Sequence, residues 1–313
     1  MPDVPLLREV VEVLEALYDP ALAEPWDAVG LVCGDPEAPV RRIVFAVDPV
    51  SAVAAEALGW GADLLVTHHP LFLTAVHGVA ATTAKGTLVH SLIRAGIALH
   101  VAHTNADRAD PGVSDALAGA LGLRELRPLE PVVAGTAVGV GRVGVLARPV
   151  PLARFVELAA AALPATAGGL RVAGDPARPV RTVAVCGGSG DFLLGAARAA
   201  GADAYLTADL RHHRAAEALE DSRPGPAWGS AAAGDRVEGP ALVDVAHWAS
   251  EWPWLPVAAR QLGETLSARD TTVDILVSRL VTDPWTAHQP MAQSHVPSDV
   301  PADVPSDVSG GVT

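Results

Sequence analysis

Residues 61–69, GADLLVTHH, and residues 201–209, GADAYLTAD, are two versions of one pattern: Gly-Ala-Asp, three mostly apolar residues, then Thr. The apolar run in each version predicts a buried β-strand. An Ala-rich helix precedes each run, and a further apolar strand (RIVFAVDP or TVAVCGGS) precedes each helix. Strands that are apolar throughout and alternate with helices indicate mixed or parallel sheets covered on both faces. The sequence therefore predicts an α/β fold.

A second pair of segments extends the repetition. LHVAHTNAD (99–107) and VDVAHWASE (243–251) both contain Val-Ala-His, three residues and a carboxylate, and both pairs are separated by offsets near 140 residues. We infer an internal duplication that produces two similar lobes, each a mixed sheet flanked by helices. The first lobe is expected at 1–125 and the second at 126–285, with residues 126–180 as a connecting segment inside the second.

Local signals place individual elements within these lobes. Apolar residues at helical spacing predict a helix over 5–18, and Gly96 ends a helix predicted over 85–95. Asp48 and Pro49 predict the cap and first turn of the helix after the strand RIVFAVDP. Residues 220–239 have the composition of a loop. The repeats of Val-Pro-Ser/Ala-Asp in residues 286–313 lack any helical period and predict a disordered tail.

Composition restricts the partners and the compartment. The net charge is −14 and Lys85 is the only lysine, so no basic surface is expected for nucleic acid or for an anionic membrane. Charged residues interrupt the longest apolar stretches, which argues against a membrane span. The N-terminus does not resemble a signal peptide, and the two cysteines form no CxxC motif. We therefore expect a cytoplasmic protein.

The repeated segments end in side chains that bind metals. Ligands of open α/β sheets gather beyond the carboxyl ends of the strands, so these groups are expected to meet in a cleft between the lobes. Imidazoles and carboxylates suit divalent ions of intermediate softness, and two carboxylates can bridge and balance two ions. The residues are His68, His69, His103, Asp107, His247 and Glu251.

Other interpretations of the same residues stay open. A lone histidine at a strand end is commonly just solvated, and the neighbours His68 and His69 would point to opposite faces unless the backbone turns before Pro70. The loop CGGSGD (186–191) could hold an anion at a helix N-terminus, although it is no nucleotide-binding motif. Asp209 and the histidines after it either line the cleft or form an exposed turn.

Five motifs, taken together and in this order, resemble those of the GTP cyclohydrolase I type 2 homologs, also called NGG-one-interacting-factor-three-like dinuclear metal proteins. The resemblance covers about residues 5 to 285. The motifs are WDAVGLVCGD (26–35), THHP (67–70), HTNAD (103–107), AVCGGSG (184–190) and AHWASE (246–251).

The resemblance implies a duplicated α/β fold, assembly as a toroidal homohexamer (a trimer of dimers), and two divalent ions per chain. Position by position, the implied metal ligands are His68, His69, Asp107, His247 and Glu251, with Glu251 or Asp107 bridging. His103 matches a family histidine beside the metals that handles protons or supports a ligand, and His213 matches a further histidine near the site. The metal itself stays open among iron, manganese, zinc, nickel and cobalt.

Two functions are compatible with this set of residues. The first is a metal-dependent hydrolase, for which the family name suggests a GTP cyclohydrolase-type reaction on a small-molecule substrate. The absence of a phosphate-binding loop and the acidic composition give little support to GTP itself. The second is a non-catalytic ring that handles metals or binds a partner.

Overall fold

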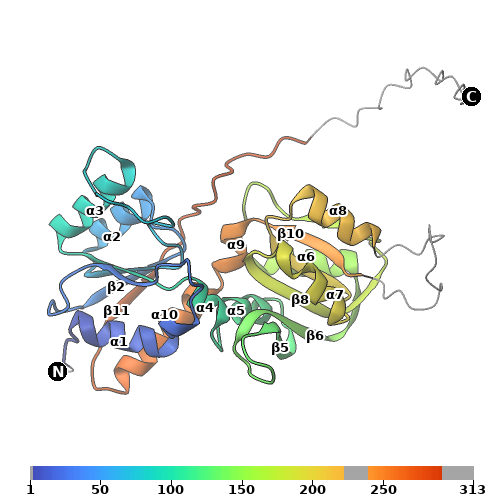
Figure 1. Cartoon of the computed structure of the whole chain (residues 1–313), viewed down its shortest axis with the longest axis horizontal. Helices are drawn as coiled ribbons and strands as arrows, with labels where there is room; N and C mark the ends of the chain where they lie inside the picture. The colour runs from blue at the N-terminus through green and yellow to red at the C-terminus, as the bar shows by residue number, and fades with distance from the viewer. Residues whose placement is uncertain (1–2, 222–238, 291–313) are drawn as a thin grey trace, which may run out of the picture.

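The computed structural model describes residues 3–221 and 239–290. Its strands form two sheets that lie side by side, each with helices packed on both faces (Figure 1). This arrangement confirms the predicted mixed α/β fold. Residues 222–238 of the predicted loop and residues 291–313 of the predicted tail lie outside the described residues.

The first sheet has the strand order β1-β4-β3-β2-β11. The neighbouring strands β4, β3, β2 and β11 run parallel to one another, and β1 pairs with β4 in the antiparallel direction. Almost every residue of the three central strands is buried, as expected for a sheet covered on both faces. The strands are β1 (Gly30–Cys33), β2 (Arg42–Ala46), β3 (Leu64–Thr67), β4 (Ala98–Val101) and β11 (Asp274–Val277).

Two pairs of helices cover the first sheet. Helices α2 (Ser51–Trp60) and α3 (Ala84–Ala95) pack on one face, and α1 (Leu7–Leu17) and α10 (Trp254–Ser267) pack on the other. Helix α3 ends at Gly96 in the left-handed conformation, as predicted. Helix α2 begins later than predicted: its N-cap is Val50, without a side-chain cap, and the Asp48 carboxylate instead contacts His69 and Thr282.

The second sheet has the strand order β5-β6-β8-β9-β10-β7. Strands β8, β9 and β10 are parallel, and the other three pair in the antiparallel direction. Alternate residues of β8 pack against α7 on one face and against α5 and α6 on the other. The strands are β5 (Arg124–Pro131), β6 (Gly139–Pro151), β7 (Arg171–Ala173), β8 (Pro179–Ser189), β9 (Ala204–Ala208) and β10 (Ala241–Val245).

The remaining helices are short. They are α5 (Val113–Ala120), α6 (Leu152–Ala162), α7 (Leu194–Ala199) and α8 (His212–Glu220), together with α4 (Thr104–Arg108) after β4 and α9 (His247–Glu251) after β10. One continuous hydrophobic core extends from α1 through α5 and α10 to the second sheet. Within the described ranges, no helix has both the length and the apolar character needed to cross a membrane.

The parallel strands β2-β3-β4 and β8-β9-β10 follow the same order and direction. This correspondence is what the inferred duplication leads us to expect. Residues 274–277, which the expected boundaries assign to the second lobe, instead add β11 to the edge of the first sheet beside β2. The chain therefore leaves the first sheet, builds the second, and returns.

Candidate metal centre

The two histidines that end the first repeat turn toward the same place. Strand β3 stops at Thr67, the backbone bends at His68 and His69, and their amide groups bond to the carbonyl oxygens of Ala46 and Val47. The two imidazole rings lie with their centroids 5.1 Å apart. The bend removes the alternation of an extended strand, so both rings reach one site.

Four histidines have the same hydrogen-bonding arrangement. In each ring, Nδ1 is bonded to an oxygen: Ala102 O for His68, Asp48 Oδ1 for His69, Asp27 Oδ2 for His103 and Asp209 Oδ2 for His247, at distances of 2.7 to 2.9 Å. A carbonyl or an ionised carboxylate can only accept, so Nδ1 is the donor in each ring. In its neutral form each ring therefore carries its lone pair on Nε2.

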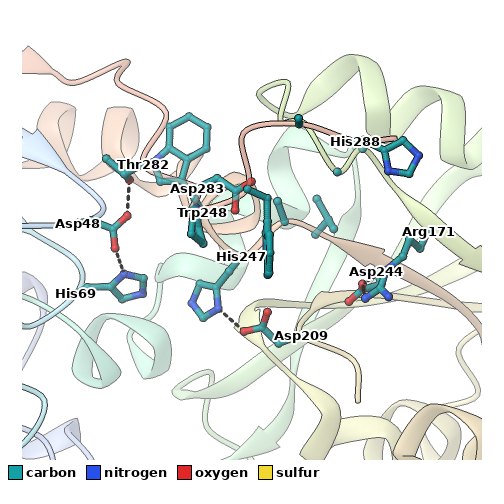
Figure 2. Close-up of a pocket in the computed structure, with 17 residues that line it drawn as sticks. Asp48, His69, Arg171, Asp209, Asp244, His247, Trp248, Thr282, Asp283 and His288 are labelled. Atoms are coloured by element: carbon teal, nitrogen blue, oxygen red, sulfur yellow. Dashed lines mark hydrogen bonds and ion pairs between the residues drawn. The ribbon is translucent and has the colours of Figure 1, made fainter. Parts of the chain in front are cut away.

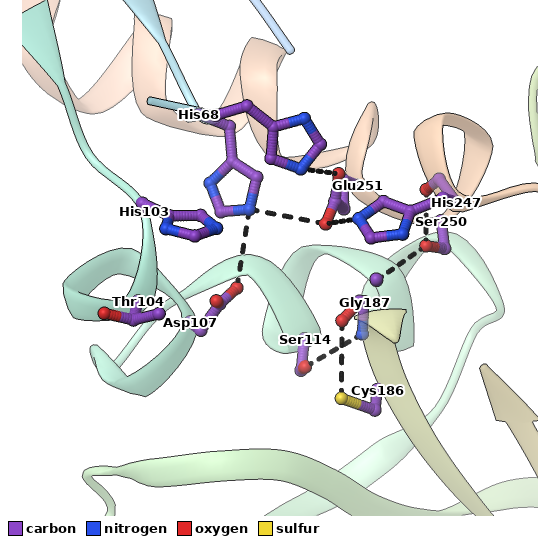
Figure 3. Close-up of polar contacts among 12 residues, drawn as sticks. His68, His103, Thr104, Asp107, Ser114, Cys186, Gly187, His247, Ser250 and Glu251 are labelled. Atoms are coloured by element: carbon purple, nitrogen blue, oxygen red, sulfur yellow. Dashed lines mark hydrogen bonds and ion pairs between the residues drawn. The ribbon is translucent and has the colours of Figure 1, made fainter. Parts of the chain in front are cut away.

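The Glu251 carboxylate lies among these Nε2 atoms (Figure 3). Its Oε1 atom is 2.9 Å from His247 Nε2 and 3.4 Å from His68 Nε2, and its Oε2 atom is 3.1 Å from His69 Nε2. Only 3% of the Glu251 side chain is exposed. Asp107 approaches from α4, with Oδ1 3.6 Å from His68 Nε2. Imidazoles that follow β3 and β4 of the first sheet thus share a small volume with His247 and Glu251 of α9.

The pKa values reflect how strongly these groups interact. Burial alone would lower the pKa of His69 and His247, but the Glu251 charge and hydrogen bonds to Asp48 or Asp209 outweigh it and raise the pKa to about 10 and about 11. Burial would raise the pKa of Glu251, yet the three neighbouring imidazoles hold it well below its usual range. The opposite shifts of the rings and of the carboxylate have one cause, the attraction between the imidazolium and carboxylate charges.

Asp107 and His103 shift in the other direction. Burial raises the pKa of Asp107 to about 6, with the Glu251 charge adding to the effect and His68 opposing it. Burial and the neighbouring His68 lower the pKa of His103 to about 4, although Asp27 opposes the change. His103 is therefore a neutral imidazole near pH 7.

These residues fit a divalent cation. Two buried atoms, His68 Nε2 and Glu251 Oε2, have no hydrogen bond in the described residues. A bound cation would satisfy both atoms. Two groups of three residues have ligand atoms within 4.8 Å of one another, and each could hold a metal ion: His68, His69 and His103; and His69, His247 and Glu251. Imidazole and carboxylate ligands suit zinc, iron, manganese, nickel or cobalt.

The surroundings of Gly188 explain why the motif CGGSGD (186–191) of the second lobe has a glycine at this position. Gly188 has a positive φ of 68°, and a Cβ there would lie 2.5 Å from Glu251 Oε1 and 3.1 Å from His247 Nε2. The amide groups of Gly187 and Gly188 donate to the hydroxyl groups of Ser114 and Ser250. The loop therefore makes room for the centre, and these two donors are not available to an anion as the sequence had suggested.

A cavity of about 400 Å³ opens onto the centre beside Glu251. Asp107, His103 and His247 line it, together with two aromatic side chains, Trp26 from the first lobe and Phe192 from the second, which are 60% and 57% exposed. Arg108 is the only arginine or lysine among its described lining residues, and it is paired with Glu24. The cavity has the size of a small-molecule site.

The structure brings together six of the seven residues singled out from the sequence, namely His68, His69, His103, Asp107, His247 and Glu251. The seventh, His213, is exposed on α8, where its ring contacts His212, and it belongs to neither ligand group. The two residues follow a turn rather than the end of a buried strand, so the repeat does not carry them to the centre. The suggested role of His213 at the site is therefore not supported.

Three carboxylates hold the histidines: Asp27 and Asp48, which were missed as functional residues, and Asp209, which the sequence placed either in the cleft or in an exposed turn. Asp48 and Asp209 follow β2 and β9 at the same ends of the sheets as the ligands, which is the signal that could have identified them. Asp27 lies in an irregular segment before β1, and its fully buried carboxylate also accepts bonds from Thr104. Only the structure relates it to His103.

The fold and the site define an α/β protein with buried histidine and glutamate groups that could hold a metal ion. The model of the Duf34/NIF3 (NGG1p interacting factor 3) family matches residues 5–284, and the chain belongs to this family.

Relatives match over nearly their whole length. The Streptomyces coelicolor protein named GTP cyclohydrolase 1 type 2 homolog is 54% identical over 288 residues, which cover 91% of this chain and 95% of that protein. The Mycobacterium tuberculosis protein of the same name is 36% identical, with 89% and 96% covered. The solved structure of the Bacillus cereus protein related to NIF3 has the same fold, with a TM-score of 0.77, 24% identity, and coverage of 90% and 99%.

Proposed function

We propose that the chain binds two divalent metal ions and is a metal-dependent hydrolase. The observation that carries the proposal is the common orientation of four imidazoles, each with Nδ1 bonded to an oxygen acceptor. This arrangement points the Nε2 lone pairs of the neutral rings into the centre, where they can bind a cation. A hydrogen-bonded partner orients ligating histidines in the same way in other metal sites. The adjoining cavity gives a substrate access to the same atoms.

Two ions are favoured over one by the position of Glu251. Its two oxygens face different histidines, Oε1 toward His247 and His68 and Oε2 toward His69. A single Nε2 lone pair serves one ion, so His69 cannot complete both ligand groups, and Asp107 supplies a further ligand near His68. We assign His68, His69, Asp107, His247 and Glu251 as ligands, with Glu251 bridging.

Different residues around the cavity would have different roles in the proposed hydrolysis. Bound divalent ions would lower the pKa of a water molecule and polarise an oxygen of the substrate. His103 lines the cavity, stays neutral near pH 7, and is oriented by Asp27, so it can accept a proton from a group that reacts there. Trp26 and Phe192 form apolar walls that restrict water around the substrate.

The charges of the cavity narrow the substrate class. Glu24, Asp107 and Glu251 line it, and its arginine is already paired. Apart from the bound ions, whose charge the ligand carboxylates partly balance, a triphosphate would find few free positive groups among the described lining residues. We therefore propose hydrolysis of a small substrate that carries less negative charge than GTP, although the names of the relatives suggest a GTP cyclohydrolase-type reaction.

Metal analysis and activity screening test the proposal separately. Elemental analysis of the purified chain should find close to two ions, and the His68→Ala, His69→Ala double variant should hold one or none. Full occupancy in that variant would contradict the ligand assignment. His213→Ala is the matched control, because it removes an exposed imidazole and should keep both ions.

Activity is then sought with nucleotides, phosphoesters and amides in the presence of Mn²⁺, Fe²⁺, Zn²⁺ or Co²⁺. A true activity should disappear with a chelator and in the Glu251→Gln variant. If every screen is negative while two ions are bound, the hydrolase proposal fails and the non-catalytic, metal-handling function replaces it.

A further inference from the structure

A second, larger cavity of about 650 Å³ lies against His69 and His247 (Figure 2). It is lined by Asp48 and Asp209, the carboxylates bonded to Nδ1 of these histidines, but not by Glu251 or Asp107. The cavity therefore faces the Nδ1 side of the two rings, away from the ligand atoms. The hydrolase proposal assigns it no role.

Negative charge dominates its walls. Four aspartates line the cavity, and each comes from a different segment of the chain: Asp48, Asp209, Asp244 and Asp283. Arg171 is the only arginine or lysine among the described lining residues, and it is paired with Asp244.

Asp283 is the carboxylate that lacks a partner. It lies in the segment that follows β11, next to Thr282, whose hydroxyl group donates to Asp48. Only 8% of Asp283 is exposed, and its buried Oδ2 atom has no hydrogen-bond partner in the described residues. A buried, unpaired carboxylate is costly, and a positively charged donor would remove that cost.

The shape of the site favours an organic cation over a metal ion. Within the described ranges, groups of three or more ligand atoms within 4.8 Å of one another occur twice, and neither group includes an aspartate of this cavity. The cavity is far larger than an ion requires, and the indole rings of Trp248 and Trp285 add apolar and aromatic surface to its walls.

We propose that this cavity is a binding site for a small organic cation, a molecule with an amidinium, guanidinium or ammonium group on an apolar body. The cationic group donates to Asp283, and the apolar body packs against Trp248 and Trp285. The site is separate from the metal centre and goes beyond the hydrolase proposal, so it stands or falls independently of any activity.

The test uses benzamidine, which carries a planar cation on an aromatic ring, and its neutral analogue benzamide. Calorimetry on the full-length chain with measured metal content should detect binding of benzamidine and little or none of benzamide. Asp283→Asn should weaken benzamidine binding roughly tenfold or more, since a charge-assisted hydrogen bond is lost. Asp274→Asn is the matched control, because it removes an exposed carboxylate on β11, outside the cavity.

Three outcomes would overturn the proposal. They are equal binding of benzamide and benzamidine, unchanged binding in Asp283→Asn, and no binding of benzamidine to the metal-loaded protein. A third equivalent of Mn²⁺ that disappears in Asp283→Asn would also overturn it, because the cation would then be a metal ion. Unchanged metal content and unfolding temperature in Asp283→Asn exclude a collapse of the fold as the cause of weaker binding.

Discussion

Binding of a divalent ion between His69 and His247 should release protons, and the affinity should rise steeply with pH. In the metal-free chain the pKa values of the two rings are about 10 and about 11, so both are protonated at pH 7. Their Nε2 nitrogens lie 3.1 and 2.9 Å from the Glu251 oxygens, so each protonated ring faces this carboxylate. A metal ion has to displace both protons.

The size of the effect follows from linkage. Each proton released on binding makes the apparent association constant rise roughly tenfold per pH unit, so two protons make it rise roughly a hundredfold. The sign is fixed by the raised pKa values: acid adds competing protons, and the dependence continues upward until the pH approaches about 10, where His69 begins to lose its proton. Between pH 6.5 and 8.5 the slope should stay near its maximum.

Calorimetry can count the protons directly. Metal-free protein is titrated with Mn²⁺ in PIPES and in Tris at the same pH, and the difference in apparent enthalpy gives the number released. Asp48→Asn keeps an acceptor for His69 Nδ1 but removes a negative charge, so the pH dependence should level off at a lower pH than in the wild type. Asp274→Asn, which removes a distant carboxylate, should behave as the wild type does.

Release of less than one proton, or an affinity that does not change between pH 6.5 and 8.5, would refute this reasoning. Either result would mean that the rings already present free Nε2 lone pairs in the metal-free chain. Such lone pairs would contradict the raised pKa values of His69 and His247, which follow from the Glu251 charge and from the hydrogen bonds to Asp48 and Asp209.

Further consequences can be checked with simple variants and measurements. Gly188→Ala should lower the bound metal measured by elemental analysis, because its Cβ would lie 2.5 Å from the ligand carboxylate, whereas Gly195→Ala, with open space around it, should bind normally. The free energy of unfolding of the metal-free chain, measured with urea, should fall as pH rises toward about 10. The raised pKa of His69 stabilises the fold fully below its unfolded value of about 6.5, and that contribution is lost through the folded value. Light scattering should give about six times the chain mass of 32.1 kDa if the expected homohexamer forms.

The elements of the fold were predictable because their signals are local. The all-apolar strands, the helical spacing at residues 5–18 and the position of Gly96 each predict an element that the structure contains. The return of residues 274–277 to the first sheet was not predictable in this way. Whether a segment becomes an edge strand depends on which neighbouring strand has an unpaired edge and on the path of the chain. A four-residue segment contains neither kind of information.

Repetition predicted which histidines and carboxylates would lie close together, but it did not predict the carboxylates that hydrogen-bond to the histidines. His103 with Asp107 and His247 with Glu251 recur at matched positions of two similar segments, so each pair strengthens the other. Asp27 has no repeated counterpart, and its contact with His103 joins residues that are 76 positions apart. His213 was placed near the site only by the resemblance, and the structure puts it on α8, exposed and in contact with His212.

Two positions explain why the two halves contribute unequally to the centre. Residues 68 and 69 of the first repeat correspond to residues 208 and 209 of the second, where an alanine and an aspartate replace the two histidines. His69 faces Glu251 through Nε2, whereas Asp209 lies on the far side of His247 and accepts from its Nδ1 atom. A histidine at 209 would remove this acceptor from His247. The inferred duplication thus accounts for the matched places of His103 and His247, and the changes at the two matched positions account for the different side chains that each half brings to the centre.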